Sequence, residues 1–257
     1  MIMGILESNN SVQVFSLDLL PVPDLSGFSK STDPAVLIDL IQEKVTDCQA
    51  RDVALSLPDN YKAIFLRKDT SFIKEGLKRS LSEHLQPELL GALLNELYLA
   101  INLFGSITLD EKPLVSLRVV TAEYVEKEHP SVSKYYHRDA AALTLTKCFY
   151  GEGAIYLREQ NTNRTYFNVN SIALNDRDAA YDDADCQVVP QSKWILLKGE
   201  MYKGIDARNQ AVVDIVLGEG AQFKDFAKGN GLIHKGGRFI DTDRRLVFTI
   251  SSYKTEF

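Results

Sequence analysis

The chain has 257 residues, 45% of them hydrophobic and 25% charged, an ordinary balance for a soluble globular protein that excludes extensive disorder. Its formal net charge of -6 argues against a nucleic-acid partner, because nucleic-acid binding requires a dominant basic surface. Three widely spaced cysteines without a CxxC motif favour a reduced, cytoplasmic protein, and we expect neither a disulfide framework nor a membrane-spanning segment.

Residues 1–112 are expected to be the mostly helical N-terminal part of a single domain that spans residues 1–257. Asp33 to Cys48 begins with an Asp-Pro helix start and carries apolar residues at helical spacing, so it predicts an amphipathic helix. Thr70 to Phe104 predicts two further helices that separate at Pro87. Between these regions, Lys62 to Leu66 predicts a short strand.

Residues 113–257 change to short β-rich runs separated by Gly, Asn and Asp. Asn161 to Arg164 is interpreted as a hairpin turn between two of these runs. Strands that follow helices, without alternation, predict an α+β, β-dominated fold with N-terminal helices packed on an antiparallel sandwich or jelly roll. The predicted strands are Leu114 to Glu123, Ala141 to Tyr150, Ala154 to Arg158, Thr165 to Val169, Trp194 to Leu197, Ala211 to Val216 and Arg245 to Tyr253.

A metal-ligand pattern is formed by the triplet His137-Arg138-Asp139 and the distant His234. Side chains alternate along a strand, so His137 and Asp139 point to the same side. With His234 from another strand they make a two-histidine, one-carboxylate triad, which suits Fe(II) and leaves coordination positions open. The same ligands also suit Zn²⁺ or Ni²⁺, so the residue types leave the metal open.

Of the other two histidines, His84 is expected to face solvent from a helix. His129 lies in a loop close to the triplet, where a role beside the metal or a substrate stays open.

Two arginines follow His234 at the start of the last predicted strand, and only one of them can face a pocket because neighbouring strand residues point to opposite sides. A guanidinium pairs with a carboxylate through two parallel hydrogen bonds. We favour Arg245, because Val247, Thr249 and Ser251 share its face, and we interpret Arg244 as a surface or salt-bridge residue.

Six short segments carry a family resemblance: Ala63–Arg67, His137–Asp139, Cys148–Gly153, Leu196–Glu200, Gly231–His234 and Arg245–Ile250. Through them the chain from Lys62 onward resembles the uncharacterised bacterial domain-of-unknown-function family 1826. The H-x-D triplet, distal histidine and following arginine are in turn similar to Fe(II)/2-oxoglutarate-dependent dioxygenases. That similarity implies a double-stranded β-helix (jelly roll, cupin-like).

The resemblance implies an enzyme with Fe(II) and 2-oxoglutarate as cofactors, which oxidises a small molecule or an amino-acid-like substrate. It implies metal binding by His137, Asp139 and His234, and co-substrate binding by Arg245 and Thr249. Two alternatives stay open: a cupin-like metal-binding protein without 2-oxoglutarate, and a β-sandwich binding module with a vestigial site. Further candidates for the pocket lining are Arg118, Tyr135 and Tyr136, whereas Cys148 is expected to be a buried thiol.

Overall fold

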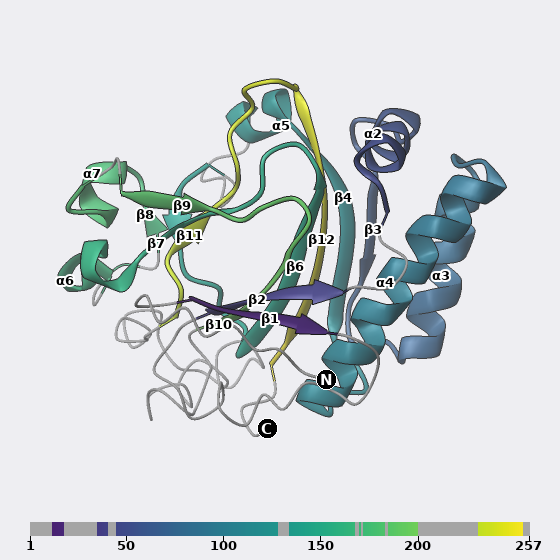
Figure 1. Cartoon of the computed structure of the whole chain (residues 1–257), viewed down its shortest axis with the longest axis horizontal. Helices are drawn as coiled ribbons and strands as arrows, with labels where there is room; N and C mark the ends of the chain where they lie inside the picture. Colours follow the sequence, from purple (N-terminus) through teal and green to yellow (C-terminus); the bar gives the residue numbers. More distant parts are fainter. Residues whose placement is uncertain are drawn as a thin grey trace.

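Two β-sheets and a group of N-terminal helices make up the fold (Figure 1). The structure, a computed structural model, describes residues 12–17, 35–40, 45–127, 134–167, 170, 172–182, 185–199 and 231–253. Ala211 to Val216, predicted as a strand, lies outside these residues, as does His129.

The larger sheet has seven strands in the order β1-β2-β10-β6-β12-β4-β3. β1 and β2 pair in parallel, and every other neighbouring pair in this sheet is antiparallel. The strands are β1 (Val12–Leu17), β2 (Ala35–Leu40), β3 (Lys62–Phe65), β4 (Leu114–Thr121), β6 (Leu143–Tyr150), β10 (Trp194–Lys198) and β12 (Arg244–Ser252).

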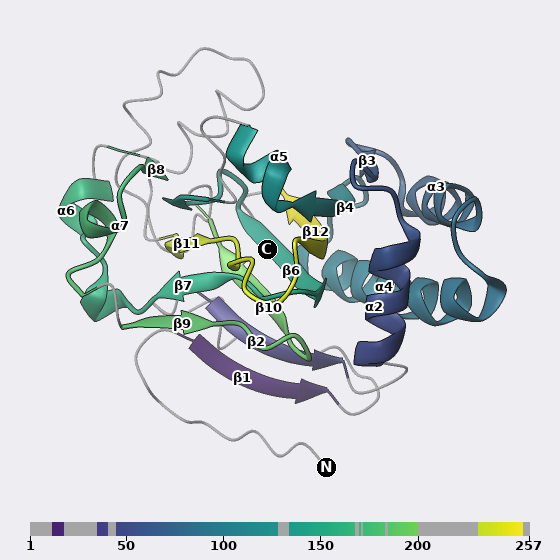
Figure 2. The same ribbon diagram turned by 90° about the horizontal axis from the view of Figure 1, so that it is seen from above.

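Helices cover one face of this sheet: α2 (Asp47–Ser56), α3 (Thr70–Ser82) and α4 (Pro87–Thr108) (Figures 1 and 2). Thr46 and Gln49 form a capping box that starts α2, and Pro87 lies in the first turn of α4. Alternate residues of β12 such as Leu246, Phe248 and Ile250 are fully buried against the helices. The residues between them face the other side of the sheet.

By length and composition α4 is apolar enough to cross a membrane. Leu93, Leu97 and Phe104 from this helix are fully buried in the core that it shares with the sheet. Glu96, on the same helix, receives hydrogen bonds from Lys147 and Trp194 of the sheet. Packing inside the protein therefore accounts for the apolar side of α4.

The smaller sheet has five short strands in the order β8-β5-β11-β7-β9, and its neighbouring strands are antiparallel. Its outer side carries the single-turn helices α6 (Arg164–Phe167) and α7 (Asp176–Ala179) (Figure 1). The strands are β5 (Tyr136–His137), β7 (Ile155–Leu157), β8 (Ile172–Ala173), β9 (Cys186–Val188) and β11 (His234–Lys235). Two further short helices are α5 (Ala122–Lys127) and the 3-10 turn η1 (Glu159–Asn161).

Most predicted elements are confirmed, but three are wrong. The helix predicted over Asp33 to Cys48 is a strand at Ala35–Leu40, and helix α2 begins only at Asp47. This apolar run pairs with β10 on one side and with β1 on the other. Five apolar residues in the segment satisfy a helical spacing, but pairing with the neighbouring strands overrides it.

The strand predicted over Thr165 to Val169 and the hairpin turn predicted at Asn161 to Arg164 are also wrong. Glu159–Asn161 forms the 3-10 turn and Arg164–Phe167 forms α6. Asn161 is buried and bonds the backbone of Asp182 and Asp185, and an isolated β-bridge joins Thr162 to Ala180. The segment is therefore held by the loop opposite and does not continue into a paired strand.

Candidate metal centre and anion pocket

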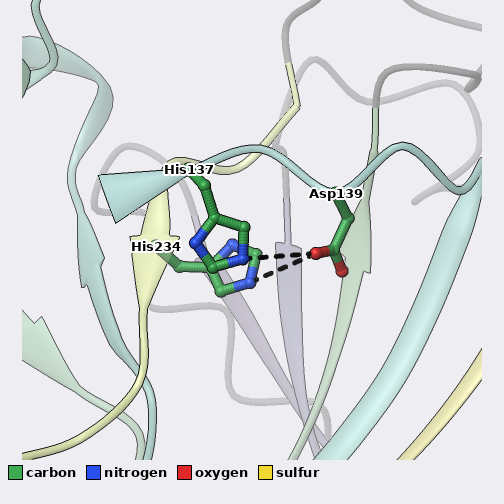
Figure 3. Close-up of side chains that lie close together, drawn as sticks. All are labelled: His137, Asp139 and His234. Atoms are coloured by element: carbon green, nitrogen blue, oxygen red, sulfur yellow. Dashed lines mark ion pairs between the residues drawn. The ribbon is translucent and has the colours of Figure 1, made fainter. Parts of the chain in front are cut away.

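Three potential metal ligands meet between the two sheets. His137 ends β5, Asp139 follows two residues later, and His234 begins β11, which pairs antiparallel with β5 so that His234 lies opposite His137. The Oδ1 atom of Asp139 lies 3.6 Å from Nε2 of His137 and 3.6 Å from Nε2 of His234 (Figure 3). Potential ligand atoms of all three residues lie within 4.8 Å of one another.

Backbone carbonyls fix both imidazoles. Nδ1 of His137 lies 2.9 Å from the carbonyl oxygen of Tyr135, and Nδ1 of His234 lies 3.1 Å from that of Leu232. A carbonyl oxygen only accepts hydrogen bonds, so each Nδ1 carries the proton and donates it. In the neutral form of each ring, Nε2 then carries the lone pair, and both Nε2 atoms face Asp139 (Figure 3).

The spacing of the three side chains suits one metal ion better than direct hydrogen bonds. A separation of 3.6 Å between nitrogen and oxygen exceeds an ordinary hydrogen bond. Two ligand atoms that each lie about 2.1 Å from one ion are separated by roughly 3.0 to 3.4 Å in octahedral or tetrahedral geometry. A small movement of the side chains therefore brings all three onto one ion.

The electrostatics also favour the protonation states that bind a metal. Burial alone would raise the pKa of Asp139, but His234, His137 and a hydrogen bond from Thr144 together hold it well below its usual range. Burial lowers the pKa of His234, and the negative charge of Asp139 offsets only part of that decrease. At neutral pH the cluster therefore offers a carboxylate and a neutral imidazole, the forms that metals bind.

A pocket of about 140 Å³ extends from this cluster along the inner face of the larger sheet. Its middle is lined by hydroxyls of β6 and β12, among which Thr146 Oγ1 lies 3.0 Å from Thr249 Oγ1. Its lining also includes Arg118 of β4 and Arg245 of β12. Thr144 is near Asp139, whereas Arg245 lies against Gly151 beyond the far end of β6, so the triad and the arginine are at opposite ends of the pocket.

Arg245 is 3% exposed, and its guanidinium carbon lies 4.9 Å from the centroid of the Phe239 ring. Within the described residues its buried Nε has no hydrogen-bond partner. Gly151, with φ +85°, lies so close that an added Cβ would be 2.5 Å from Cγ of Arg245. The guanidinium is thus held in a buried position with hydrogen-bonding capacity unused, which points to an anionic ligand.

Arg244 points to the opposite side of the sheet, where it pairs with Asp59. Its Nη1 also donates to the carbonyl oxygens of Ala54 and Leu57 at 3.0 and 3.4 Å, at the end of α2. Periodicity alone could not decide which of the two arginines faces the pocket. The packing of β12 on α2 decides it, because Arg244 lies on the face that contacts α2 and Arg245 lies on the opposite face.

Arg118 lies in the pocket, whereas Tyr135 and Tyr136 are not among the residues that line it. Cys148 is buried, and burial raises the pKa of its thiol to about 11. His84 is exposed and makes an edge-to-face contact with Tyr61 at 5.7 Å.

Sequence reasoning missed Thr146, Phe239 and the contact between Gly151 and Arg245. The alternation of Thr144, Thr146 and Cys148 with larger residues along β6 was a signal for the first of these. Phe239 and Gly151 reach Arg245 only through loops, so no local pattern could have indicated them.

No family model matches the chain, so the resemblance to domain-of-unknown-function family 1826 has no support from that comparison. No curated protein matches the sequence either. Among solved structures, the chain is similar to a dioxygenase for auxin oxidation from Arabidopsis thaliana in a binary complex with 2-oxoglutarate. The TM-score is 0.51 at 6% identity, over 96% of this chain and 93% of that one.

A rice dioxygenase for auxin oxidation is matched with a TM-score of 0.48 at 9% identity, over 87% of this chain and 74% of that one. Sequence identities this low bear on the fold alone. The mixed helix and antiparallel-sheet architecture is therefore similar to that of the Arabidopsis dioxygenase for auxin oxidation.

Proposed function

We propose that this chain is a non-haem Fe(II)/2-oxoglutarate-dependent oxygenase, built as one domain over residues 1–257 on a double-stranded β-helix, the jelly roll of cupin-like proteins. The observation that carries the proposal is the shared pocket: a His-Asp-His cluster lies at one end and a buried arginine without a hydrogen-bond partner for its Nε among the described residues lies at the other. The similarity in fold to a 2-oxoglutarate-bound dioxygenase supports it.

His137, Asp139 and His234 would hold Fe(II). The carboxylate of Asp139 and the neutral imidazole of His234 suit a divalent cation, and the hydrogen bonds from each Nδ1 to a backbone carbonyl keep the imidazoles oriented before a metal arrives. Three protein ligands leave positions for other molecules. When bound, the iron supplies the activation of dioxygen and the oxidation of the substrate.

Arg245 would hold the distal carboxylate of 2-oxoglutarate, and Thr249 would bind the same co-substrate nearer the metal. The distance along the strands suits an extended dicarboxylate: Thr144, near Asp139, and Cys148, beside Arg245, are four residues apart on β6, which corresponds to roughly 13 Å of strand. The long side chain of Arg245 shortens that span. The hydroxyls of Thr146 and Thr249 then provide polar contacts midway.

The two sheets shield this pocket from most of the solvent, since the side chains of His137, Asp139 and His234 are only 12%, 24% and 10% exposed. A low-dielectric pocket strengthens the pairing of Arg245 with a carboxylate. The substrate is proposed to be a small molecule or amino-acid-like compound. We also propose a cytoplasmic location, which the three free thiols favour.

The test is release of succinate from 2-oxoglutarate under aerobic conditions with Fe(II), measured without any added substrate. We expect slow turnover in the parent protein and loss of turnover in His234→Ala and Arg245→Gln. Two matched controls, His84→Ala and Arg51→Gln, change exposed residues of the same types outside the pocket and should keep the parent rate.

Background succinate in the parent protein, together with no binding of 2-oxoglutarate, would refute the proposal. Metal binding that depends on His137 but without 2-oxoglutarate binding would instead favour a cupin-like metal protein. Absence of both would favour a binding module with a vestigial site.

A further inference from the structure

Two arginines, and not one, face the co-substrate end of the pocket. In the register of β4 and β12, Arg118 pairs with Val247 and Arg245 pairs with Val120, so the two arginines are diagonal neighbours on the same face. Diagonal neighbours have Cα atoms about 7 to 8 Å apart, within reach of long side chains. Both line the pocket, and the buried Nε of each has no hydrogen-bond partner within the described residues.

The other basic residues that line the pocket have acidic partners of their own. Lys147 pairs with Glu96 and is 4% exposed, and Lys235 pairs with Asp176 at 2.5 Å.

The acidic group that lines the pocket and the one that interacts with Arg245 are equally engaged. Glu152 interacts electrostatically with Arg245, but its carboxylate accepts hydrogen bonds from the guanidinium and the backbone nitrogen of Arg238. Asp139 belongs to the metal cluster. Within the described residues, two guanidiniums thus remain together without a carboxylate of their own.

Two like charges held close together in a buried pocket repel each other. Burial lowers the pKa of Arg245, and the charge of Arg118 lowers it further. An anion placed between the two guanidiniums would relieve both the repulsion and the unused hydrogen-bonding capacity.

Resting on the proposed function, we propose that Arg118 is a second co-substrate-binding residue that clamps, together with Arg245, the same distal carboxylate of the 2-oxo acid. This pair makes the pocket select 2-oxo acids with a second carboxylate over those with a single charge. Arg118 binds through its guanidinium and leaves the oxo-acid end at the metal untouched.

The experiment compares two probes on the Mn²⁺-loaded full chain by calorimetry. 2-Oxoglutarate carries the distal carboxylate, whereas 2-oxopentanoate has the same oxo-acid end and chain length without it. For Arg118→Gln we expect the Kd of 2-oxoglutarate to rise about tenfold or more, because a buried charge-assisted hydrogen bond is lost. The Kd of 2-oxopentanoate should stay within about twofold.

Two further variants separate binding from folding. Arg118→Lys keeps the positive charge and should recover part of the affinity for 2-oxoglutarate, since only the fork geometry is lost. Arg51→Gln, an exposed arginine on α2, is the matched control and should leave both Kd values unchanged.

If Arg118→Gln binds 2-oxoglutarate as tightly as the parent while Arg245→Gln loses it, the double clamp is overturned and the proposed function stands. Equal weakening of both probes in Arg118→Gln would also overturn the clamp, because it would mean that Arg118 supports the pocket as a whole. If the parent binds neither probe, the proposed function itself fails, and the clamp with it.

Discussion

Gly151 lies directly against the stem of Arg245, so its replacement by alanine tests how that arginine is held. Gly151 has φ +85°, in the left-handed region, and an added Cβ would lie 2.5 Å from Arg245 Cγ and 3.0 Å from the carbonyl oxygen of Arg244. Both atoms belong to β12, which is paired on its two sides. The backbone therefore has little freedom, and the Arg245 side chain has to move.

The magnitude follows from these contacts. A non-glycine residue in the left-handed region costs about 1 to 2 kcal/mol, and relief of the contact with Arg245 adds to that cost, so we expect the free energy of unfolding to fall by about 2 to 3 kcal/mol. Cγ of Arg245 must shift by roughly 1 Å to reach ordinary van der Waals distance. A misplacement of about 1 Å in a binding group lowers turnover by up to about 100-fold.

The assay combines urea denaturation with the rate of succinate release from 2-oxoglutarate. Gly91→Ala is the matched control, because Gly91 is exposed in α4 and an added Cβ there meets nothing within 4 Å. It should stabilise the helix by about 1 kcal/mol and leave the rate unchanged. A Gly151→Ala protein with the urea midpoint and succinate rate of the parent would refute the close packing of Gly151 on Arg245.

Three more predictions concern the interior and the metal. Glu96→Gln leaves the buried charge of Lys147 without its partner and should lower the free energy of unfolding by about 3 to 5 kcal/mol. The double change Glu96→Gln, Lys147→Met removes both charges and keeps an acceptor for Trp194, so it should cost much less, and equal losses in urea denaturation would contradict this. Burial raises the pKa of the Cys148 thiol to about 11, so at pH 8 the exposed Cys48 should be alkylated first. The stability linked to Cys148 is present below the ordinary thiol pKa of 9.0 and is lost as the pH rises towards 11. Cys148→Ala should abolish this pH dependence of the free energy of unfolding. Mn²⁺ at about a hundred times its Kd should raise the free energy of unfolding by about 2.7 kcal/mol, and a chelator should reverse this rise. A similar rise in the His234→Ala variant would count against the cluster as the binding site.

Local patterns were enough to predict the elements whose periodicity is long and regular. The spacing of Leu89 to Leu97 and the position of Pro87 predicted α4, and alternating short runs predicted β4, β6 and β12. Ala35–Leu40 was predicted wrongly, because a six-residue apolar run suits either a helix or a strand until its neighbours are known. β1 and β10 are those neighbours, and β10, at Trp194–Lys198, is remote in the sequence.

The sequence by itself determined which chemistry the pocket can carry, since imidazole, carboxylate and guanidinium are properties of His137, Asp139, His234 and Arg245 as residue types. Tertiary structure alone decided how they are arranged. The pairing of β5 with β11 sets His234 opposite His137, and the register of β4 against β12 sets Arg118 diagonal to Arg245. Both faces of β12 are largely buried, so the alternation of its side chains could not indicate which face lines the pocket. Helix α2 packs on the face that carries Arg244, and the face that carries Arg245 therefore lines the pocket.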